Sequence, residues 1–162
     1  MTSQKSILIV GCSTHGISSM LAQELAKRNH LVFIAVPDPS KVPQHTSTLP
    51  TVKVITLDPR TPASVAEGAK AVASATEEEH GARGLDVLIN DAGLSQPLAL
   101  LDAVMDAAKD VYEAKVTETL SMAGAFVDVL ARKQGRILNL SSSGAFIAAP
   151  CMSPFRPALT TA

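Results

Sequence analysis

Apolar residues occur along this chain both in short unbroken runs and in longer stretches where they recur every three or four positions. Unbroken runs rich in β-branched residues are typical of strands buried on both faces of a sheet, and the wider spacing is typical of helices. The runs predict five strands, at Ser6–Val10, Leu31–Val36, Val52–Leu57, Leu85–Asn90 and Arg136–Leu140. The periodic stretches predict helices over about Gly16–Asn29, Ala63–Glu79 and Leu98–Lys133, the last with a break near Asp110.

Strands that alternate with helices imply right-handed crossovers and a parallel sheet covered on both faces. We therefore predict an α/β fold with strand order 3-2-1-4-5, formed by residues 1–162 as a single domain. The periodicity of the first helix places one apolar group on its buried side, namely Ile17, Met20, Leu21 and Leu25. The segment Pro37–Pro50 predicts a loop with room for one helical turn.

The stretch Ile7–Ser18, with the sequence ILIVGCSTHGIS, predicts a strand, a tight turn and the start of a helix. Gly11 permits the turn, and Gly16 allows close approach of the backbone to a ligand or of the helix to the strand. The free N–H groups of the following helix suit a phosphate. The same glycine pattern also occurs in α/β proteins that bind nothing at this turn.

Composition excludes several classes of partner. The net charge of −1, the lack of a basic cluster and an aromatic content of 3% argue against nucleic acid. No apolar run approaches the length of a membrane span, and the N-terminus has no signal-peptide core, so we expect a cytoplasmic protein. Cys12 and Cys151 are then reduced thiols, with Cys12 a packing residue, and no metal is expected.

Four motifs, in order and at matching spacing, resemble those of the short-chain dehydrogenase/reductase family. They are GCSTHGIS after the first strand, Asp58 after the third, GLDVLINDAG (84–93) and GRILNLSSSG (135–144). The glycine loop is most similar to that of the 1-acyldihydroxyacetone-phosphate reductase-like group. The resemblance implies a Rossmann-type doubly wound sheet that binds NADH or NADPH between the first and fourth strands. It also implies that the family's last strands are missing from this chain.

The catalytic pattern of that family is largely absent here. The family uses a Ser, a Tyr-x-x-x-Lys pair and an Asn to reduce carbonyls, and only Ser142 matches. The Tyr position falls on Phe155, the Lys position on Leu159 and the Asn position on Lys115. Phe has no proton to donate and Leu has no charge, so the resemblance implies loss of the redox centre.

The cofactor side also departs from the family pattern. His15 and Ser18 replace two family glycines, and a side chain at the second would crowd a cofactor. Asp38 either accepts from a ribose 2′-hydroxyl, which favours NAD over NADP, or caps its own loop. We expect that no cofactor is required and that NADPH or NADH binds weakly. The family positions facing a nucleotide are Gly11, Ser13, His15, Gly16, Ile17, Asp58, Asn90, Ala92 and Gly93.

These departures leave three functional hypotheses. The first is a non-redox catalyst, an isomerase, lyase or cyclase of a biosynthetic pathway acting on a small organic molecule. Its candidate catalytic residues are Ser142, Lys115, Asp91 and Tyr112, although each also has an ordinary structural role open to it. The second is a binding or regulatory pseudoenzyme, and the third is a residual NAD(P)H-dependent carbonyl reductase.

The missing elements also bear on assembly. Without them the fifth strand has no outer neighbour, and Val111, Met122 and Phe126 of the long helix lose the helix that covers them in the family. Unpaired strand edges and exposed apolar surfaces invite association. We therefore expect a homodimer or larger homo-oligomer.

Overall fold

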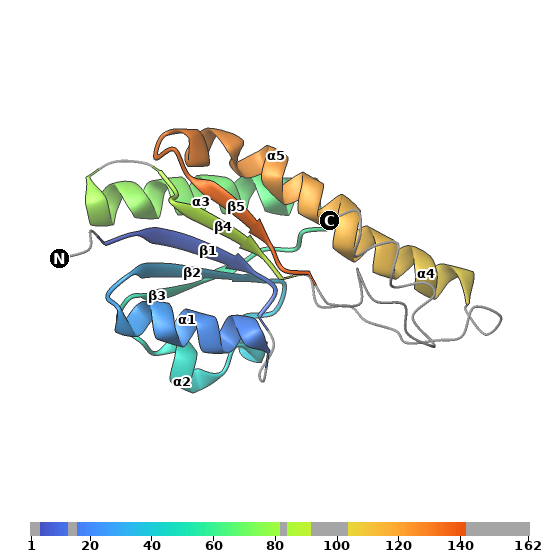
Figure 1. Ribbon diagram of the computed structural model, residues 1–162, viewed down its shortest axis with the longest axis horizontal. Coiled ribbons are helices and arrows are strands. Elements are labelled where there is room, and N and C mark those ends of the chain that lie inside the picture. Colours follow the sequence, from blue (N-terminus) through green and yellow to red (C-terminus); the bar gives the residue numbers. More distant parts are fainter. Residues whose placement is uncertain (1–3, 13–15, 82–83, 92–103, 142–162) are drawn as a thin grey trace.

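The strands form one parallel sheet in the order β3-β2-β1-β4-β5, as predicted (Figure 1). The computed structural model describes residues 4–12, 16–81, 84–91 and 104–141. β1 pairs with β2 on one side and with β4 on the other, so the strand order changes direction at β1. The strands are β1 (Ser6–Val10), β2 (Leu31–Val36), β3 (Val52–Thr56), β4 (Val87–Asn90) and β5 (Arg136–Asn139).

Helices cover both faces of the sheet (Figure 1). One face packs against α1 (Ile17–Lys27) and the short α2 (Gln44–Ser47), which follows a 3₁₀ turn at Pro39–Lys41. The other face packs against α3 (Pro62–His80) and α5 (Glu118–Ala131). α4 (Met105–Tyr112) leads into α5 through a π-helical turn at Glu113–Thr117, close to the break expected near Asp110. In Figure 1, α4 extends past the ends of the strands.

The limits of α3 follow from its terminal residues. Thr61 is the N-cap residue and Pro62 the first helical residue, where a missing N–H costs no hydrogen bond. Gly81 ends the helix with φ of 67°, a left-handed conformation that glycine adopts without strain. α3 therefore begins and ends within one residue of the predicted range.

The predicted buried side of α1 is wrong at two positions. Ile17 and Met20 are each 70% exposed, while Ser18, Ser19 and Ala22 are buried. Leu21 and Leu25 pack against the core as partly buried residues. Small side chains let the start of α1 lie close to the sheet, and this close contact outweighs the hydrophobic pattern there.

The expected exposure of the long helix is also wrong. Val111, Met122 and Phe126 are buried within the chain itself, and Met122 and Phe126 pack in the core on the α3 side of the sheet. The large apolar residues of α5 that are exposed are Leu120 and Val127. α5 therefore buries Met122 and Phe126 against its own sheet and leaves Leu120 and Val127 outside.

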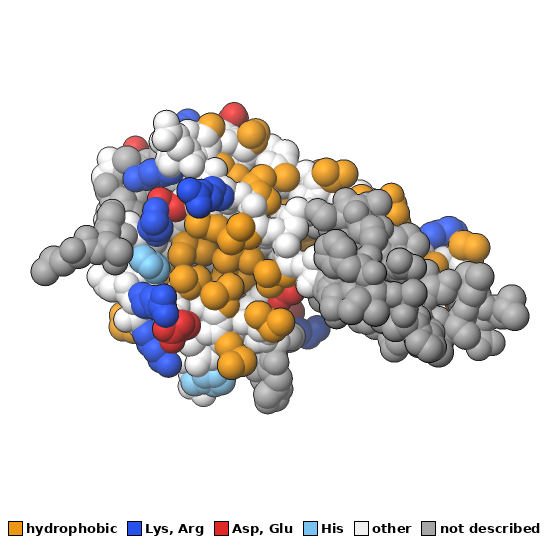
Figure 2. Space-filling view, in the orientation of Figure 1, with side chains coloured by type: hydrophobic (Ala, Val, Ile, Leu, Met, Phe, Trp, Pro, Cys, Tyr) orange, Lys and Arg blue, Asp and Glu red, His pale blue; other side chains and the backbone are white. Residues whose placement is uncertain are grey.

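β5 lies at the edge of the described sheet, and all four of its residues are exposed. Leu138 pairs with Ile89 and lies on the α1 side, where it is 49% exposed. Figure 2 shows apolar side chains gathered over the middle of this face, bordered by Lys and Arg. Among the described helices, none is both long and apolar enough to cross a membrane.

Candidate functional site

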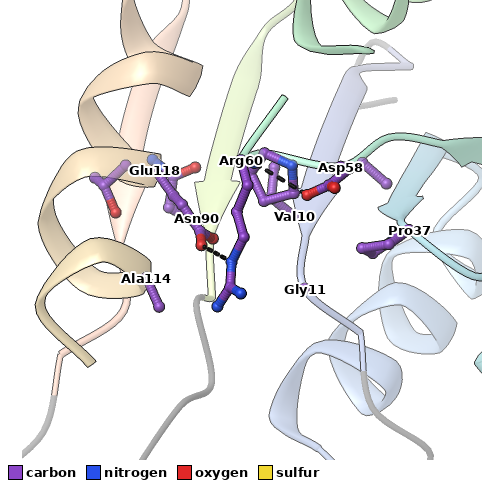
Figure 3. A pocket seen from close by; sticks show the side chains of 11 residues that line it. Val10, Gly11, Pro37, Asp58, Arg60, Asn90, Ala114 and Glu118 are labelled. Atoms are coloured by element: carbon purple, nitrogen blue, oxygen red, sulfur yellow. Dashed lines mark hydrogen bonds and ion pairs between the residues drawn. The ribbon is translucent and has the colours of Figure 1, made fainter. Parts of the chain in front are cut away.

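A crevice of about 420 Å³ opens at the carboxyl ends of the strands (Figure 3). Its lining comes from the ends of β1, β2 and β4, the loop after β3, the π-helical turn and the start of α5. It lies where the strand order changes direction, which is where open α/β sheets bind ligands. We call it the carboxyl-end crevice. Its lining residues are Val10, Gly11, Ala35, Pro37, Asp58, Pro59, Arg60, Asn90, Ala114, Glu118 and Thr119.

Gly11 forms the β1 end of the crevice. Its φ of 83° lies in the left-handed region, where a side chain would be strained. Its N–H donates to the carbonyl oxygen of Ala35 at 3.2 Å, which holds the turn against β2. The conformation of this turn therefore explains why a glycine is present here, without any ligand.

Asp58 holds the turn after β3. Its Oδ1 accepts from the backbone N–H of Arg60 at 3.0 Å, and its Oδ2 accepts from Oγ1 of Thr61 at 3.3 Å. The carboxylate thus shapes the loop leading into α3 while its residue lines the crevice. Asp58 therefore has a structural role in the turn after β3 that needs no ligand.

Arg60 and Glu118 form an ion pair at the crevice. Nε of Arg60 donates to Oε1 of Glu118 at 2.9 Å, and Figure 3 shows the arginine side chain lying between Gly11 and Ala114. The Glu118 side chain is only 10% exposed, whereas that of Arg60 is 51% exposed. The hydrogen bond and the charge of Glu118 raise the pKa of Arg60 further above its usual value.

Asn90 ends β4 at the inner side of the crevice. Its Nδ2 donates to Oδ1 of Asn139 at 2.9 Å, which joins the ends of β4 and β5. Its Oδ1 is buried and has no hydrogen-bond partner among the described residues. A buried acceptor without a donor costs free energy, so it is a place where a ligand or water donor would be favourable.

Asp91 and Ser18, two departures from the family pattern, contact each other. Oγ of Ser18, in the first turn of α1, donates to Oδ2 of Asp91. Ser18 is completely buried, so its side chain fills space between α1 and the turn after β4. Both departures therefore belong to one contact between these two elements.

Lys115 is buried in the π-helical turn that precedes α5. It is 8% exposed, and burial lowers the pKa of its ammonium, while the charge of Asp91 acts in the opposite direction. π-helical turns are rare and frequent at functional sites. Cys12 is also buried in the core, and burial raises the pKa of its thiol, while a hydrogen bond with Ser19 opposes this effect and the charge of Asp91 adds to it.

The structure does not bring all the predicted catalytic residues together. Lys115 and Asp91 are near enough to interact electrostatically. Tyr112 is 47% exposed and lines a separate shallow hollow with Met105 and Lys109 rather than the carboxyl-end crevice. Outside the described residues lie Ser142, Ser13, His15, Ala92, Gly93, Phe155 and Leu159.

The predicted cofactor residues are similarly divided. Gly11, Asp58 and Asn90 line the crevice. Gly16 is the N-cap residue of α1, and Ile17 is largely exposed. Asp38 caps its own loop, with Oδ1 accepting from N and Oγ of Ser40 at 3.0 and 2.7 Å.

Sequence reasoning missed Arg60 and Glu118. They are 58 positions apart, and neither belongs to a recognisable motif. The only local signal was the position of Arg60 two residues after the strand-ending Asp58.

The described residues also contain no group of three or more His, Cys, Asp or Glu side chains able to hold a metal ion.

Residues 5–157 match the family model for short chain dehydrogenases, and the chain belongs to this family. It is 33% identical over 138 residues to the short-chain dehydrogenase cctT of Talaromyces islandicus, covering 85% of this chain and 47% of that protein. It is 28% identical over 158 residues to the mitochondrial D-beta-hydroxybutyrate dehydrogenase of Mus musculus, covering 94% and 45%. The chain thus spans about half the length of these curated relatives.

Solved structures share the fold. The chain is similar to an alcohol dehydrogenase from the archaeon Thermococcus sibiricus complexed with 5-hydroxy-NADP, with a TM-score of 0.83 and 21% identity. That comparison covers 98% of this chain and 67% of the other. A similar match to an apo SCOR enzyme from Clostridium thermocellum has a TM-score of 0.80 and 18% identity, covering 98% and 63%.

Proposed function

We propose that the carboxyl-end crevice binds the adenosine part of a nicotinamide dinucleotide. The observation that supports this most is the crevice itself, which lies beside β1 at the change of strand order and has a volume within the range of small-molecule sites, about 300–1,000 Å³. The unpaired Oδ1 of Asn90 adds a buried acceptor at its inner side. When bound, a reduced nicotinamide supplies hydride.

The lining suits a nucleoside in two respects. Val10, Ala35 and Ala114 offer small apolar surfaces for a flat ring, and Gly11 leaves the β1 end open. Asp58 and Glu118 add acceptors for amino and hydroxyl groups. We expect this binding to be weak, because Asp91 places a carboxylate beside the first turn of α1.

The test is a titration with NADH, followed by the fluorescence of the reduced nicotinamide, with 5′-AMP as the competitor. Saturable binding that 5′-AMP displaces would support the proposal. Ala114→Phe fills the crevice and should abolish binding, whereas Ala131→Phe at the exposed end of α5 should leave it unchanged. Absence of saturable binding of both NADH and 5′-AMP would overturn it.

A second candidate function is non-redox proton transfer on a small organic molecule. The specific observation that favours it is Lys115, buried in a π-helical turn, with a lowered pKa and within electrostatic reach of Asp91. A lysine with a lowered pKa exchanges protons more readily near neutral pH. Phe155 and Leu159, where the family has Tyr and Lys, give no proton donor for carbonyl reduction.

This candidate is tested with a panel of ketones and aldehydes, NADH and NADPH, and the absorbance of the reduced cofactor. We expect no appreciable cofactor oxidation, because loss of general acid catalysis alone costs roughly 10²–10⁴-fold in rate. Robust oxidation by the wild type would contradict the non-redox function. If Lys115→Ala then abolished that oxidation, Lys115 would be the replacement acid.

We also infer that the chain forms a homo-oligomer through β5. The edge strand exposes Ile137 and Leu138, and the neighbouring face is apolar (Figure 2). Sedimentation at micromolar concentration should show a dimer or larger species, and Leu138→Glu should shift it toward monomer. A clean monomer of the wild type would contradict this inference.

A further inference from the structure

The ionised side chains of the carboxyl-end crevice carry a negative balance. Its described lining contains two carboxylates, Asp58 and Glu118, and one cation, Arg60, which leaves a net charge of −1. The charges of Asp110 and Glu113 also act on Arg60. A ligand in the crevice therefore meets an arginine whose charge is already compensated.

Arg60 is held in place from both ends. Its backbone N–H donates to Asp58, and its side-chain Nε donates to Glu118. The Glu118 carboxylate is only 10% exposed, so its negative charge is held beside the guanidinium of Arg60 and offsets the positive charge there. An anion that approaches Arg60 also meets the charge of Glu118, so the pair attracts an anion less strongly than an arginine without a carboxylate partner would.

The β2 side of the crevice is acidic as well. Asp38 follows the lining residue Pro37, and its hydrogen bonds from Ser40 lower the pKa of its carboxyl, so it is ionised at neutral pH. Lys41 lies on the same exposed turn, where its charge acts on Asp38. Lys41 is not among the residues that line the crevice.

We propose that the crevice selects an adenosine with a free 2′-hydroxyl over one with a 2′-phosphate, and that Glu118 determines this preference by neutralising Arg60. A phosphate monoester carries nearly two negative charges at neutral pH. It meets carboxylates here and no uncompensated cation in the described lining. The proposal rests on the proposed nucleotide binding, and it specifies NADH rather than NADPH as the ligand.

The experiment measures the dissociation constants of NADH and NADPH for the wild type, Glu118→Gln and Arg60→Gln at low ionic strength. The readout is the ratio of the two constants, because misfolding would weaken both ligands alike. The wild type should bind NADPH at least about tenfold more weakly than NADH, as expected for two like charges a few ångströms apart in a partly buried site.

The two variants should move the ratio in opposite directions. Glu118→Gln leaves the positive charge of Arg60 uncompensated, so the affinity for NADPH should rise relative to the affinity for NADH. This rise should be smaller in high salt. Arg60→Gln removes the cation and leaves the carboxylate of Glu118, so the affinity for NADPH should fall further relative to the affinity for NADH. In the double variant with both Glu118→Gln and Arg60→Gln, the rise in relative NADPH affinity caused by Glu118→Gln should disappear.

The outcomes separate this proposal from the one on which it rests. Failure of the wild type to bind NADH and 5′-AMP would overturn nucleotide binding altogether, and the selection with it. Binding of NADPH as tight as NADH, or a ratio that Glu118→Gln leaves unchanged, would overturn the selection alone while nucleotide binding stands.

Discussion

Nε of Arg60 lies 2.9 Å from Oε1 of Glu118, so one ion pair joins the loop after β3 to the first residue of α5. The pair crosses the carboxyl-end crevice between segments that are distant in the sequence (Figure 3). A substitution of either residue is therefore expected to change both the stability of the protein and the charge of the crevice.

Arg60→Gln should destabilise the protein by about 1–3 kcal/mol, because it leaves the largely buried Glu118 carboxylate without its partner. Glu118→Gln should cost less, since an amide oxygen still accepts from Arg60. Chemical denaturation followed by circular dichroism measures both. Equal losses for the two variants would contradict the argument that the buried carboxylate is the sensitive partner.

Asp91→Asn should strengthen the binding of NADH by roughly fivefold, or about 1 kcal/mol. The change removes a negative charge beside the first turn of α1, where the family places the cofactor pyrophosphate. The measurement is the NADH titration at low ionic strength. Asp106→Asn, on the exposed surface of α4, is the matched control and should leave the affinity unchanged.

Lys115→Met should stabilise the protein by about 1 kcal/mol at pH 7, because it removes a charge that burial disfavours. The folded-state pKa of Lys115 is lowered below the unfolded value, which is about 10.4. Between these two pKa values the unfolded chain binds more protons, so the wild type's free energy of unfolding gains a contribution that rises with pH.

The difference in the free energy of unfolding between the wild type and Lys115→Met should therefore shrink as the pH rises toward 10. Denaturation curves at several pH values between 7 and 10 measure it. Lys109→Met on the exposed surface of α4 is the control for the loss of a lysine side chain. A difference between Lys115→Met and the wild type that stays constant with pH would show that the charge of Lys115 does not cause the stabilisation.

Gly135→Ala should destabilise the protein by about 1–3 kcal/mol. A Cβ at this position would lie 2.3 Å from the carbonyl oxygen of Leu85 and 2.8 Å from Cδ2 of Leu130, so the backbone before β5 would have to shift. Gly124→Ala is the matched control, because a Cβ there meets nothing within 4 Å. In the interior of α5, alanine should instead add up to about 1 kcal/mol. Thermal unfolding of the two variants distinguishes these effects.

The sequence by itself determined the fold class, the strand order and the limits of the strands to within two residues. These features depend on local patterns: unbroken apolar runs at strands such as Leu31–Val36, the Thr61-Pro62 helix start, and the glycine after β1. Local sequence also placed Gly11, Asp58 and Asn90 at strand ends, where a parallel sheet gathers its ligand-facing residues.

Only the tertiary structure decided which side chains are buried and which meet. Periodicity placed Ile17 and Met20 inward, but the close approach of α1 to the sheet selected its small residues instead. The Arg60–Glu118 pair and the Ser18–Asp91 contact join segments 58 and 73 positions apart, and no local pattern encodes them. Such contacts arise when the packing of helices on the sheet brings two charged or polar groups into a shared, partly dry space, where leaving either without a partner would cost free energy.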